Sequence, residues 1–297
     1  GVCSSPHGLT GDMAITITIA NEKGGVGKTT TAVNLAAGLA LRLSERADGS
    51  GRVLLVDMDP QVHALLAVGF DKHADTPEAS LAALLTETPP PSIQPLIQRS
   101  DHHPNLFFVP SERTAMVRAA RELPALMANE TRLQRALLAV QQEYAYIIID
   151  TPPTTGDLLI NALVAADHVI IPVETSYLGV SGLIELQRTI EQVQTHFKPD
   201  LNVLGFLPTL CEEQRSETRE ILEEMRKRYK KLLLPAIHKS SDLAYAHSSH
   251  MDVFTYRPPR NAGSQNIVSS SRPTREYAEL TDLVLKRTGA RPGARGG

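Results

Sequence analysis

The sequence predicts an α/β protein with a mostly parallel, twisted sheet and helices on both of its faces. Short apolar runs alternate with segments of helical periodicity along the chain. The runs at Arg52–Val56 and Tyr146–Asp150 are almost continuously apolar, as is typical of parallel strands buried on both faces. In addition, a glycine-rich segment joins the first apolar run to the first helical run, which is the order strand, loop, helix.

The composition describes an ordinary folded domain. Of 297 residues, 42% are apolar and 21% charged, and the net charge of −3 excludes a protein that is basic throughout. Two cysteines, Cys3 and Cys211, are too few for a disulfide framework and fit a reducing cytosol. They also argue against an iron–sulfur ATPase. The chain contains no apolar run of about 20 residues that would cross a membrane.

Periodicity and turn residues give the expected elements in order. The expected strands are Ala14–Ala20, Arg52–Val56, Leu106–Pro110, Tyr146–Asp150, His168–Val173, Asn202–Pro208 and Leu232–Ile237. The expected helices are Thr31–Leu43, Pro77–Leu85, Glu112–Met127, Thr131–Glu143, Asp157–Ala166, Gly179–His196, Glu212–Lys231 and Thr274–Arg287. Ser111 is expected to cap the helix that follows it.

These elements form one expected domain, residues 13–287, because no segment is long enough to link two domains. Residues 1–12 are rich in Gly, Ser and Pro and precede Met13. We expect them to be a disordered leader or a cloning remnant, with Met13 as the native start. The Gly- and Arg-rich residues 288–297 are expected to be a disordered tail.

The segment Asn21–Thr30 has the composition of a phosphate-binding loop, and a chance glycine-rich loop is the alternative. Glycines let backbone N–H groups turn inward around an anion, and the next helix adds its free N–H groups. A lysine at the helix start reaches the β- and γ-phosphates, and the threonine after it ligates Mg²⁺. The nucleotide-binding candidates are Gly24, Gly25, Val26, Gly27, Lys28, Thr29 and Thr30.

The loop departs from the general pattern, because Glu22 stands where a glycine is usual and Lys23 precedes the paired glycines. This K-G-G-x-G-K-T-T form resembles the deviant P-loop of the ParA/MinD ATPases, and the chain is similar to the ParA type. In that family the extra lysine crosses a dimer interface to the partner's ATP. The resemblance therefore implies catalytic roles for Lys23 and Lys28.

Carboxylates follow two of the expected strands, where ligands of parallel α/β sheets bind. Residues 53–61, V-L-L-V-D-M-D-P-Q, resemble the switch I strand of ParA-type ATPases, and residues 147–153, I-I-I-D-T-P-P, resemble switch II. By this resemblance Asp59 positions the hydrolytic water, while Asp57 and Asp150, with Thr29, hold Mg²⁺ and its waters. A turn or helix-cap role is the alternative for each of the three.

Two later segments carry weaker signals. Residues 234–256 resemble the stretch against which the family packs adenine, so Pro235 is a candidate contact to the base. Residues 226–231 hold five positive charges in six positions, which would attract DNA phosphates. A solvated helix face balanced by nearby glutamates is the alternative. The DNA-binding candidates are Arg226, Lys227, Arg228, Lys230, Lys231 and Lys239.

Taken together, the resemblance implies an Mg-dependent ATPase of DNA segregation that converts ATP and water to ADP and phosphate. It implies an ATP-sandwich homodimer that binds double-stranded DNA non-specifically and is released when a ParB-like centromere-binding partner stimulates hydrolysis. The expected location is cytoplasmic and nucleoid-associated. No membrane contact is expected, because the tail after Leu285 lacks the bulky apolar residues of an amphipathic helix. The alternatives are a MinD-like or other cargo-positioning ATPase, a metabolic P-loop enzyme, and a nucleotide-dependent scaffold.

Overall fold

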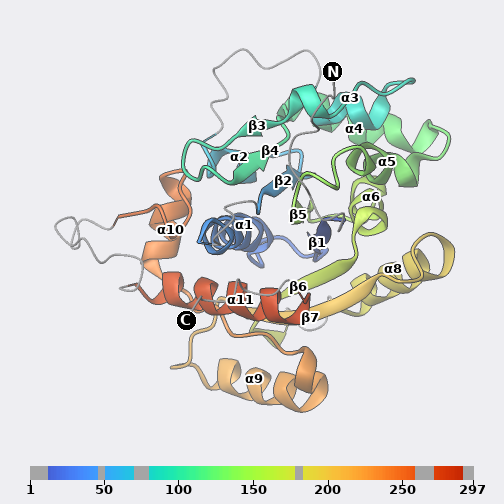
Figure 1. The fold of residues 1–297 in the computed structure, drawn as a ribbon. Coiled ribbons are helices and arrows are strands. Elements are labelled where there is room, and N and C mark those ends of the chain that lie inside the picture. The colour runs from blue at the N-terminus through green and yellow to red at the C-terminus, as the bar shows by residue number, and fades with distance from the viewer. Residues whose placement is uncertain (1–12, 46–50, 70–79, 178–182, 258–270, 290–297) are drawn as a thin grey trace.

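The computed structural model describes residues 13–45, 51–69, 80–177, 183–257 and 271–289. Seven strands form one sheet in the order β3-β4-β2-β5-β1-β6-β7, and only β3 is antiparallel to its neighbour (Figure 1). The predicted α/β class with a mostly parallel sheet is confirmed. The strands are β1 (Ile15–Ile19), β2 (Val53–Asp57), β3 (Gln98–Arg99), β4 (Leu106–Phe108), β5 (Tyr146–Asp150), β6 (His168–Glu174) and β7 (Asn202–Thr209).

Helices connect the strands and cover both faces of the sheet. The longer helices are α1 (Lys28–Ser44), α4 (Arg113–Glu122), α6 (Asp157–Ala165), α8 (Leu183–His196), α9 (Ser216–Tyr229), α10 (Ser241–Ser248) and α11 (Arg272–Arg287). The shorter ones are α2 (His63–Leu66), α3 (Leu81–Thr86) and α5 (Arg132–Leu138), with 3₁₀ turns η1 (Gln94–Leu96), η2 (Leu123–Ala125), η3 (Asn129–Thr131) and η4 (Lys230–Leu232).

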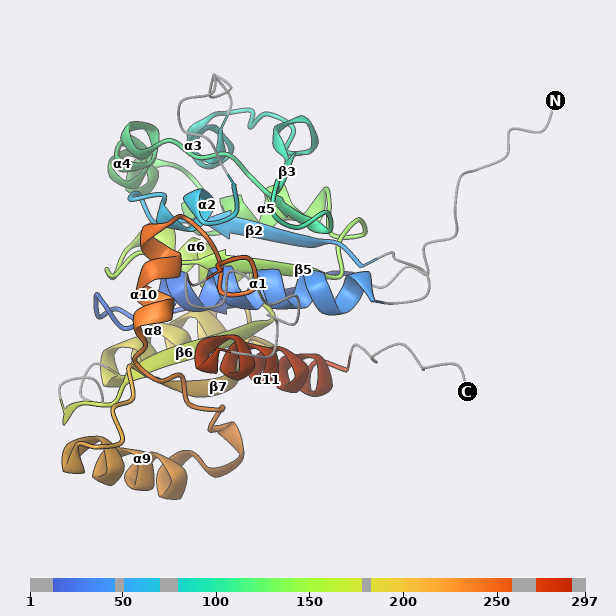
Figure 2. The same ribbon diagram turned by 90° about the vertical axis from the view of Figure 1, so that its left-hand side faces the viewer.

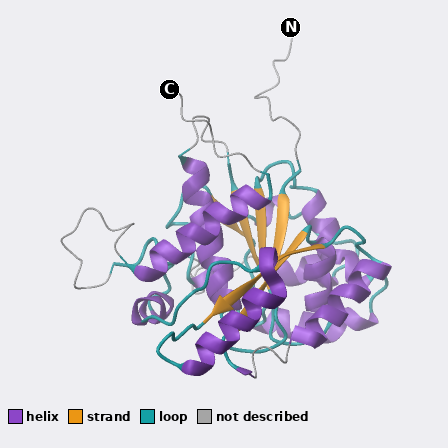
Figure 3. Ribbon diagram, turned by 90° about the horizontal axis from the view of Figure 1, so that it is seen from below, coloured by secondary structure: helices purple, strands orange, loops and turns teal. Residues whose placement is uncertain are grey.

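The sheet is buried on both faces, which explains its continuously apolar strands. Within β2, Val53 and Leu55 pack into the core beneath α1 and α11, whereas Leu54 and Val56 pack against α3–α6 on the other face. Figure 2 shows α1, α10 and α11 on one side of the sheet, and Figure 3 shows its strands fanned by twist. The helix α9 lies beyond the β7 edge.

Register brings the carboxyl ends of the central strands together. Asp57 at the end of β2 is the partner of Asp150 at the end of β5, and Asp150 is in turn the partner of Ile19 at the end of β1. The chain leaves β1 directly into the glycine-rich loop. The loop and both carboxylates therefore share one edge of the sheet.

The expected strand Leu232–Ile237 is wrong. The segment makes only isolated bridges, Phe206 with Leu233 and Cys211 with His238, and begins in the 3₁₀ turn η4. Its backbone N–H groups at Leu234 and Ile237 donate to Phe206 O and Pro208 O of β7. These donors are three residues apart, whereas a regular strand turns every second N–H toward the same neighbour, so the ladder is interrupted.

The expected cap at Ser111 is also wrong. The residue before α4 is Glu112, whose carboxylate accepts the N–H groups of Thr114 and Ala115 at 2.8 Å each. A carboxylate at a helix N-terminus is favoured by the free N–H groups and the helix dipole. Ser111 Oγ is buried without a hydrogen-bond partner in the structure. The helix that follows stops at Glu122, ahead of Pro124, and is shorter than expected.

Several other helices and strands differ from the predicted ones in their boundaries or were not predicted at all. The strand β3 and the helices α2 and α10 were not expected, and α1 begins at Lys28 rather than Thr31. The helix α11 begins at Arg272, with Pro273 in its first turn where a missing N–H costs nothing. Thr288 does not belong to a disordered tail, since its hydroxyl lies 2.6 Å from Tyr146 Oη. Residues 1–12 and 290–297 lie outside the described residues.

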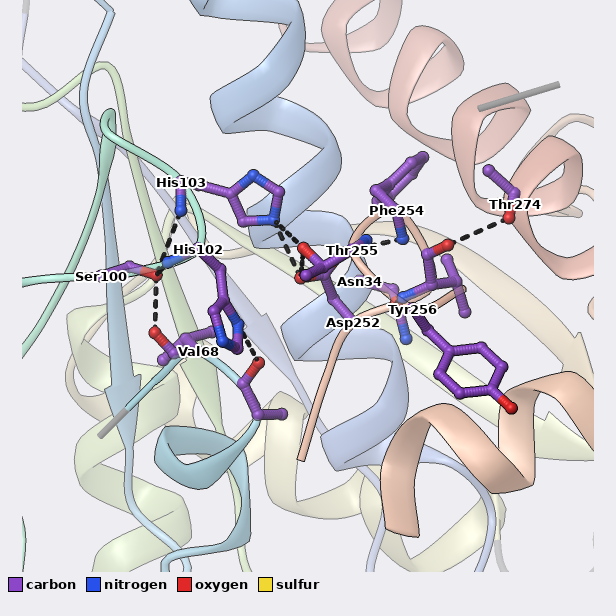
Figure 4. A network of polar contacts seen from close by, with 12 residues as sticks. Asn34, Val68, Ser100, His102, His103, Asp252, Phe254, Thr255, Tyr256 and Thr274 are labelled. Atoms are coloured by element: carbon purple, nitrogen blue, oxygen red, sulfur yellow. Dashed lines mark hydrogen bonds and ion pairs between the residues drawn. The ribbon is translucent and has the colours of Figure 1, made fainter. Parts of the chain in front are cut away.

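A buried polar network fixes the loop between α10 and α11 against the core (Figure 4). His103 Nε2 lies 2.8 Å from Asp252 Oδ2, and the Thr255 hydroxyl donates to the same oxygen. Asn34 on α1 accepts the Val253 N–H at 2.8 Å. Burial by itself raises the pKa of Asp252, but the hydrogen bond and charge of His103 and the donors of the loop hold its pKa below the usual value. The network ties this loop to the helix that starts at the glycine-rich loop.

Among the described helices, none is both long and apolar enough to span a bilayer.

Candidate nucleotide-binding site

The glycine-rich loop forms the turn from β1 to α1. Gly25 and Gly27 adopt left-handed backbone conformations, with φ of 74° and 84°, which side-chain-bearing residues rarely adopt. Gly27 is the residue that precedes the first turn of α1, so the free N–H groups of that turn begin at the loop. Gly24 and Gly25 are exposed. The loop thus leaves an open backbone surface at a helix N-terminus, which is the arrangement that binds phosphate.

The loop is held from behind by two side chains that sequence reasoning missed. Asn21 donates to Pro172 O at 2.7 Å and accepts the Lys23 N–H at 2.9 Å. Thr209, at the end of β7, donates to Val26 O at 2.9 Å. Asn21 stands directly after a predicted strand, which is a weak signal, whereas no local pattern marks Thr209. Both contacts depend on which strands lie beside β1 and β6.

Lys28 and Thr29 are the first two residues of α1. The Lys28 side chain runs back along the loop, where Nζ donates to Lys23 O at 3.0 Å. Burial lowers the pKa of Lys28, and the negative charges of Asp150 and Asp59 oppose this shift. The side chain of Thr29 lies close enough to Asp150 to oppose the rise of its pKa.

Asp57 and Asp150 lie side by side and fully buried. Burial raises the pKa of both carboxyls, and the pKa of Asp150 rises to about 7. For Asp57, the negative charge of Asp150 raises the pKa further. The oxygens of Asp57 accept the N–H groups of Asp59 and Ala64 at 3.0 and 2.9 Å. Asp150 Oδ1 accepts the Thr151 N–H, whereas its Oδ2 is buried without a hydrogen-bond partner.

An unpartnered buried carboxylate oxygen is costly unless a cation or donor satisfies it. The Asp150 carboxyl lies near the Thr29 side chain at the helix start, and both carry oxygen ligands of the kind that Mg²⁺ prefers. The residues therefore fit a magnesium ion next to a bound phosphate. Asp59 lies at the same edge, since its charge acts on Lys28, Asp57 and Asp150, and its Oδ1 accepts the Gln61 N–H.

Pro235 is half-buried in the segment after η4, which runs beside the end of β7, where the Ile237 N–H donates to Pro208 O at 2.8 Å. The next residue of β7 is Thr209, which holds the glycine-rich loop. The segment thus passes close to the site, as a contact to a nucleotide base requires.

The basic candidates lie at the outer edge of the molecule. Those in the last turn of α9 and in η4 are all exposed: Arg226, Lys227, Arg228, Lys230 and Lys231. Apolar residues such as Ile221 and Met225 pack the other face of α9 into the core. Lys239 is exposed as well and pairs with Glu212 at 3.3 Å, so that its charge is partly balanced.

The sequence profile of the family described as AAA domain matches residues 14–203. The sporulation initiation inhibitor protein Soj of Bacillus subtilis is 38% identical over 250 residues, which cover 84% of this chain and 93% of Soj. The chromosome partitioning protein ParA of Myxococcus xanthus is 41% identical over 221 residues, 74% of each chain. This chain belongs to the ParA-type family of P-loop ATPases.

Solved structures agree with the ParA-type fold. A variant of McdA from Cyanothece, solved in complex with ATP, superimposes with a TM-score of 0.75 at 22% identity, covering 94% of this chain and 98% of McdA. A Mycobacterium smegmatis protein described as cobyrinic acid a,c-diamide synthase, with bound ATP analogue and magnesium, gives 0.69 at 30% identity, covering 94% and 98%. The former likeness shows the fold alone.

Proposed function

We propose that this ParA-type protein is an Mg-dependent ATPase of DNA segregation that acts as an ATP-sandwich dimer. The observation that carries the proposal is the juxtaposition of the glycine-rich loop and its Lys28 with the buried, unpartnered oxygen of Asp150. A phosphate cradle beside a carboxylate oxygen that no protein donor satisfies suits a magnesium nucleotide. The partition proteins among its relatives support the cellular role.

Each side chain has a defined task in this proposal. The loop N–H groups surround the phosphates. The Lys28 ammonium leaves Lys23 O, its hydrogen-bond acceptor in this structure, and contacts the β- and γ-phosphates. Thr29 and Asp150 hold Mg²⁺, and Asp57 holds the water shell of the ion. The ion supplies charge neutralisation of the phosphates. Asp59, which lies at the same edge, orients the attacking water, while Pro235 contacts the base.

Lys23 makes the contact between the two subunits in this proposal. It lies on the loop next to the exposed Gly24, so a second subunit facing the loop would bring its own phosphates within reach. An ammonium group that reaches phosphate across the interface is a charge-assisted contact available only when nucleotide is bound. Nucleotide occupancy thereby controls assembly, and hydrolysis stimulated by a ParB-like partner reverses it.

The exposed basic residues at the end of α9 are the proposed DNA contacts, with Lys239 as an additional one. Lysine and arginine side chains that contact phosphates give an affinity that does not depend on the base sequence, and we propose this kind of contact here. Pairing two subunits doubles the number of phosphates contacted. The ATP dimer therefore binds nucleoid DNA and the monomer releases it.

A metabolic P-loop enzyme is the second candidate, favoured by the likeness to the protein described as cobyrinic acid a,c-diamide synthase. The two candidates differ in what nucleotide binding changes. A partition ATPase changes its oligomeric state and its affinity for DNA, whereas a synthase changes its affinity for an organic acid substrate. An ATP-dependent change of oligomeric state and of DNA affinity in the unmodified protein separates them.

Replacing Lys23 with alanine is expected to abolish the ATP-dependent dimer while sparing nucleotide binding by the monomer. Removing one partner of a desolvated charged contact costs about 2–5 kcal/mol, and the loss occurs twice in a symmetric dimer. Light scattering during size-exclusion chromatography with Mg-ATP measures the dimer, and titration with a fluorescent ADP measures monomer binding. A Lys23→Ala protein that dimerises on ATP like the unmodified protein would refute the role of Lys23.

A further inference from the structure

Lys23 has a partner within its own subunit. Its Nζ forms an ion pair and hydrogen bond with Oε2 of Glu174, the last residue of β6. The two side chains are each 32% exposed, so the pair lies at the rim of the site and not in the core. Sequence reasoning gave no indication of it, because 151 positions separate the two residues.

Hydrogen bonds tie the backbone on both sides of this pair. The Lys23 N–H is held by Asn21 Oδ1, and Asn21 donates to Pro172 O in the same strand that ends at Glu174. On the other side of the loop, Glu22 accepts the Thr189 hydroxyl of α8 at 3.0 Å. The loop is thus bonded to β6 and α8 by groups other than the Lys23 ammonium, and these contacts do not depend on the ion pair.

Both lysines of the loop are satisfied by protein groups in this structure. Lys28 Nζ donates to the carbonyl of Lys23, and Lys23 Nζ contacts Glu174. A phosphate that approaches the loop must compete with a neutral carbonyl for Lys28, but with a full negative charge for Lys23. Charge-assisted hydrogen bonds are about twice as strong as neutral ones. The release of Lys23 is therefore the more demanding of the two exchanges.

We propose that Glu174 is a positioning residue that holds Lys23 on its own subunit and thereby sets the threshold for ATP-dependent dimerisation. The inference rests on the proposed function, in which Lys23 contacts the partner's nucleotide. An ammonium group held at hydrogen-bond distance from Glu174 is directed toward its own subunit, so the contact across the interface requires that this pair open. The phosphates of a facing subunit provide the competing negative charge.

The size of the effect follows from the exposure of the pair. Partly exposed ion pairs contribute modestly, and a factor of about three per subunit is in the measured range. A symmetric dimer opens two such pairs, so the factors multiply to about ten in the dimerisation constant. The effect is expected to weaken with added salt, because both side chains contact solvent.

The test is Glu174→Gln, which keeps the shape and a hydrogen-bond acceptor but removes the charge. With saturating Mg-ATP, we expect the variant to reach half-maximal dimer at about ten-fold lower protein concentration, measured by analytical ultracentrifugation. Binding of fluorescent ADP to the monomer is expected to stay within about two-fold. Asp282→Asn is the matched control, since it removes the charge from the Arg42 ion pair at the opposite end of α1 and is expected to leave dimerisation unchanged.

Three outcomes would overturn the inference. The first is that Glu174→Gln dimerises as strongly as the unmodified protein, and the second is that it dimerises more weakly. The third is that its monomer binds ADP and ATP more tightly by the same factor of about ten by which its dimerisation increases. The last would show that Glu174 acts only as a general negative charge. Failure of the proposed function has a different signature, because Lys23→Ala would then dimerise like the unmodified protein. If Lys23→Ala loses the dimer while Glu174→Gln matches the unmodified protein, only the role of Glu174 is refuted.

Discussion

Replacing Lys28 with alanine is expected to lower the affinity for ATP by about 100-fold or more, the largest loss from any single substitution in the site. The Lys28 side chain is only 6% exposed, and its Nζ has a neutral carbonyl as its resting partner. Moving this ammonium to the phosphates replaces that contact by charged ones in a water-poor site. Truncating one partner of such a pair costs about 2–5 kcal/mol. Calorimetric titration with a non-hydrolysable ATP analogue measures the change.

The control for this substitution is Lys198→Ala. Lys198 is another partly buried lysine, with its side chain 18% exposed, and it pairs with Asp167 just before β6, at the opposite end of the strand from the site. It tests whether loss of a packed lysine by itself weakens nucleotide binding through the fold. ATP affinity within about three-fold of the unmodified protein in Lys28→Ala would contradict the assignment of this lysine to the phosphates.

Replacing Asp150 with asparagine is expected to stabilise the nucleotide-free protein while removing its response to Mg-ATP. Burial raises the pKa of Asp150 to about 7 from a usual value of 3.8, so the folded protein at pH 8 carries a buried charge that opposes folding. Each pKa unit corresponds to about 1.4 kcal/mol, and we expect a gain of about 2–4 kcal/mol at pH 8. For a chain of this size that corresponds to a rise in melting temperature of about 5–10 °C.

The pH dependence follows from the same shift. Because the folded-state pKa of Asp150 lies above the unfolded one, the folded state holds a proton that the unfolded state releases between about pH 4 and 7. Stability of the nucleotide-free protein from this group is therefore highest below pH 4 and falls as the pH rises to 7. Asp150→Asn is expected to flatten this part of the profile, measured by thermal melts from pH 5 to 8.

The Mg-ATP arm of the same experiment separates the two effects. In the unmodified protein, Mg-ATP is expected to raise the melting temperature, because ligand binding to the folded state stabilises it. In Asp150→Asn this rise should be largely lost, since the negative charge and one of the two oxygens that would hold Mg²⁺ are gone. A variant that is less stable than the unmodified protein without nucleotide, yet stabilised as strongly by Mg-ATP, would contradict the assignment.

Local sequence was sufficient to predict an element wherever burial or backbone conformation restricts which residue types can stand there. The strand Tyr146–Asp150 was predicted to the residue, because a run buried on both faces must be apolar. The loop was predicted from its glycines between a strand and a helix, and two of them, Gly25 and Gly27, occupy left-handed conformations that require glycine. In the same way, the neighbouring positions of Asp57 and Asp150 follow from a parallel sheet whose strands end at one edge.

The contacts that could not be predicted from the sequence depend on the order of the strands in the sheet. The contact of Glu174 with Lys23 exists because β6 lies beside β1, and Thr209 reaches Val26 because β7 comes next. The short strand β3 consists of two exposed polar residues with no apolar alternation to mark it. The apolar run around Pro235 suggested a strand, but the N–H groups of this segment do not meet β7 at the regular two-residue spacing of a ladder.

We propose that ATP switches this protein onto DNA, and the direct measurement is its binding to an arbitrary DNA duplex. Fluorescence anisotropy would be recorded with Mg-ATP, with Mg-ADP and without nucleotide, each at two salt concentrations. We expect tight binding only with Mg-ATP, weakened about 100-fold by a four-fold rise in salt if about four phosphates are neutralised. Absence of binding in all three states, or equal binding in all three, would contradict the account.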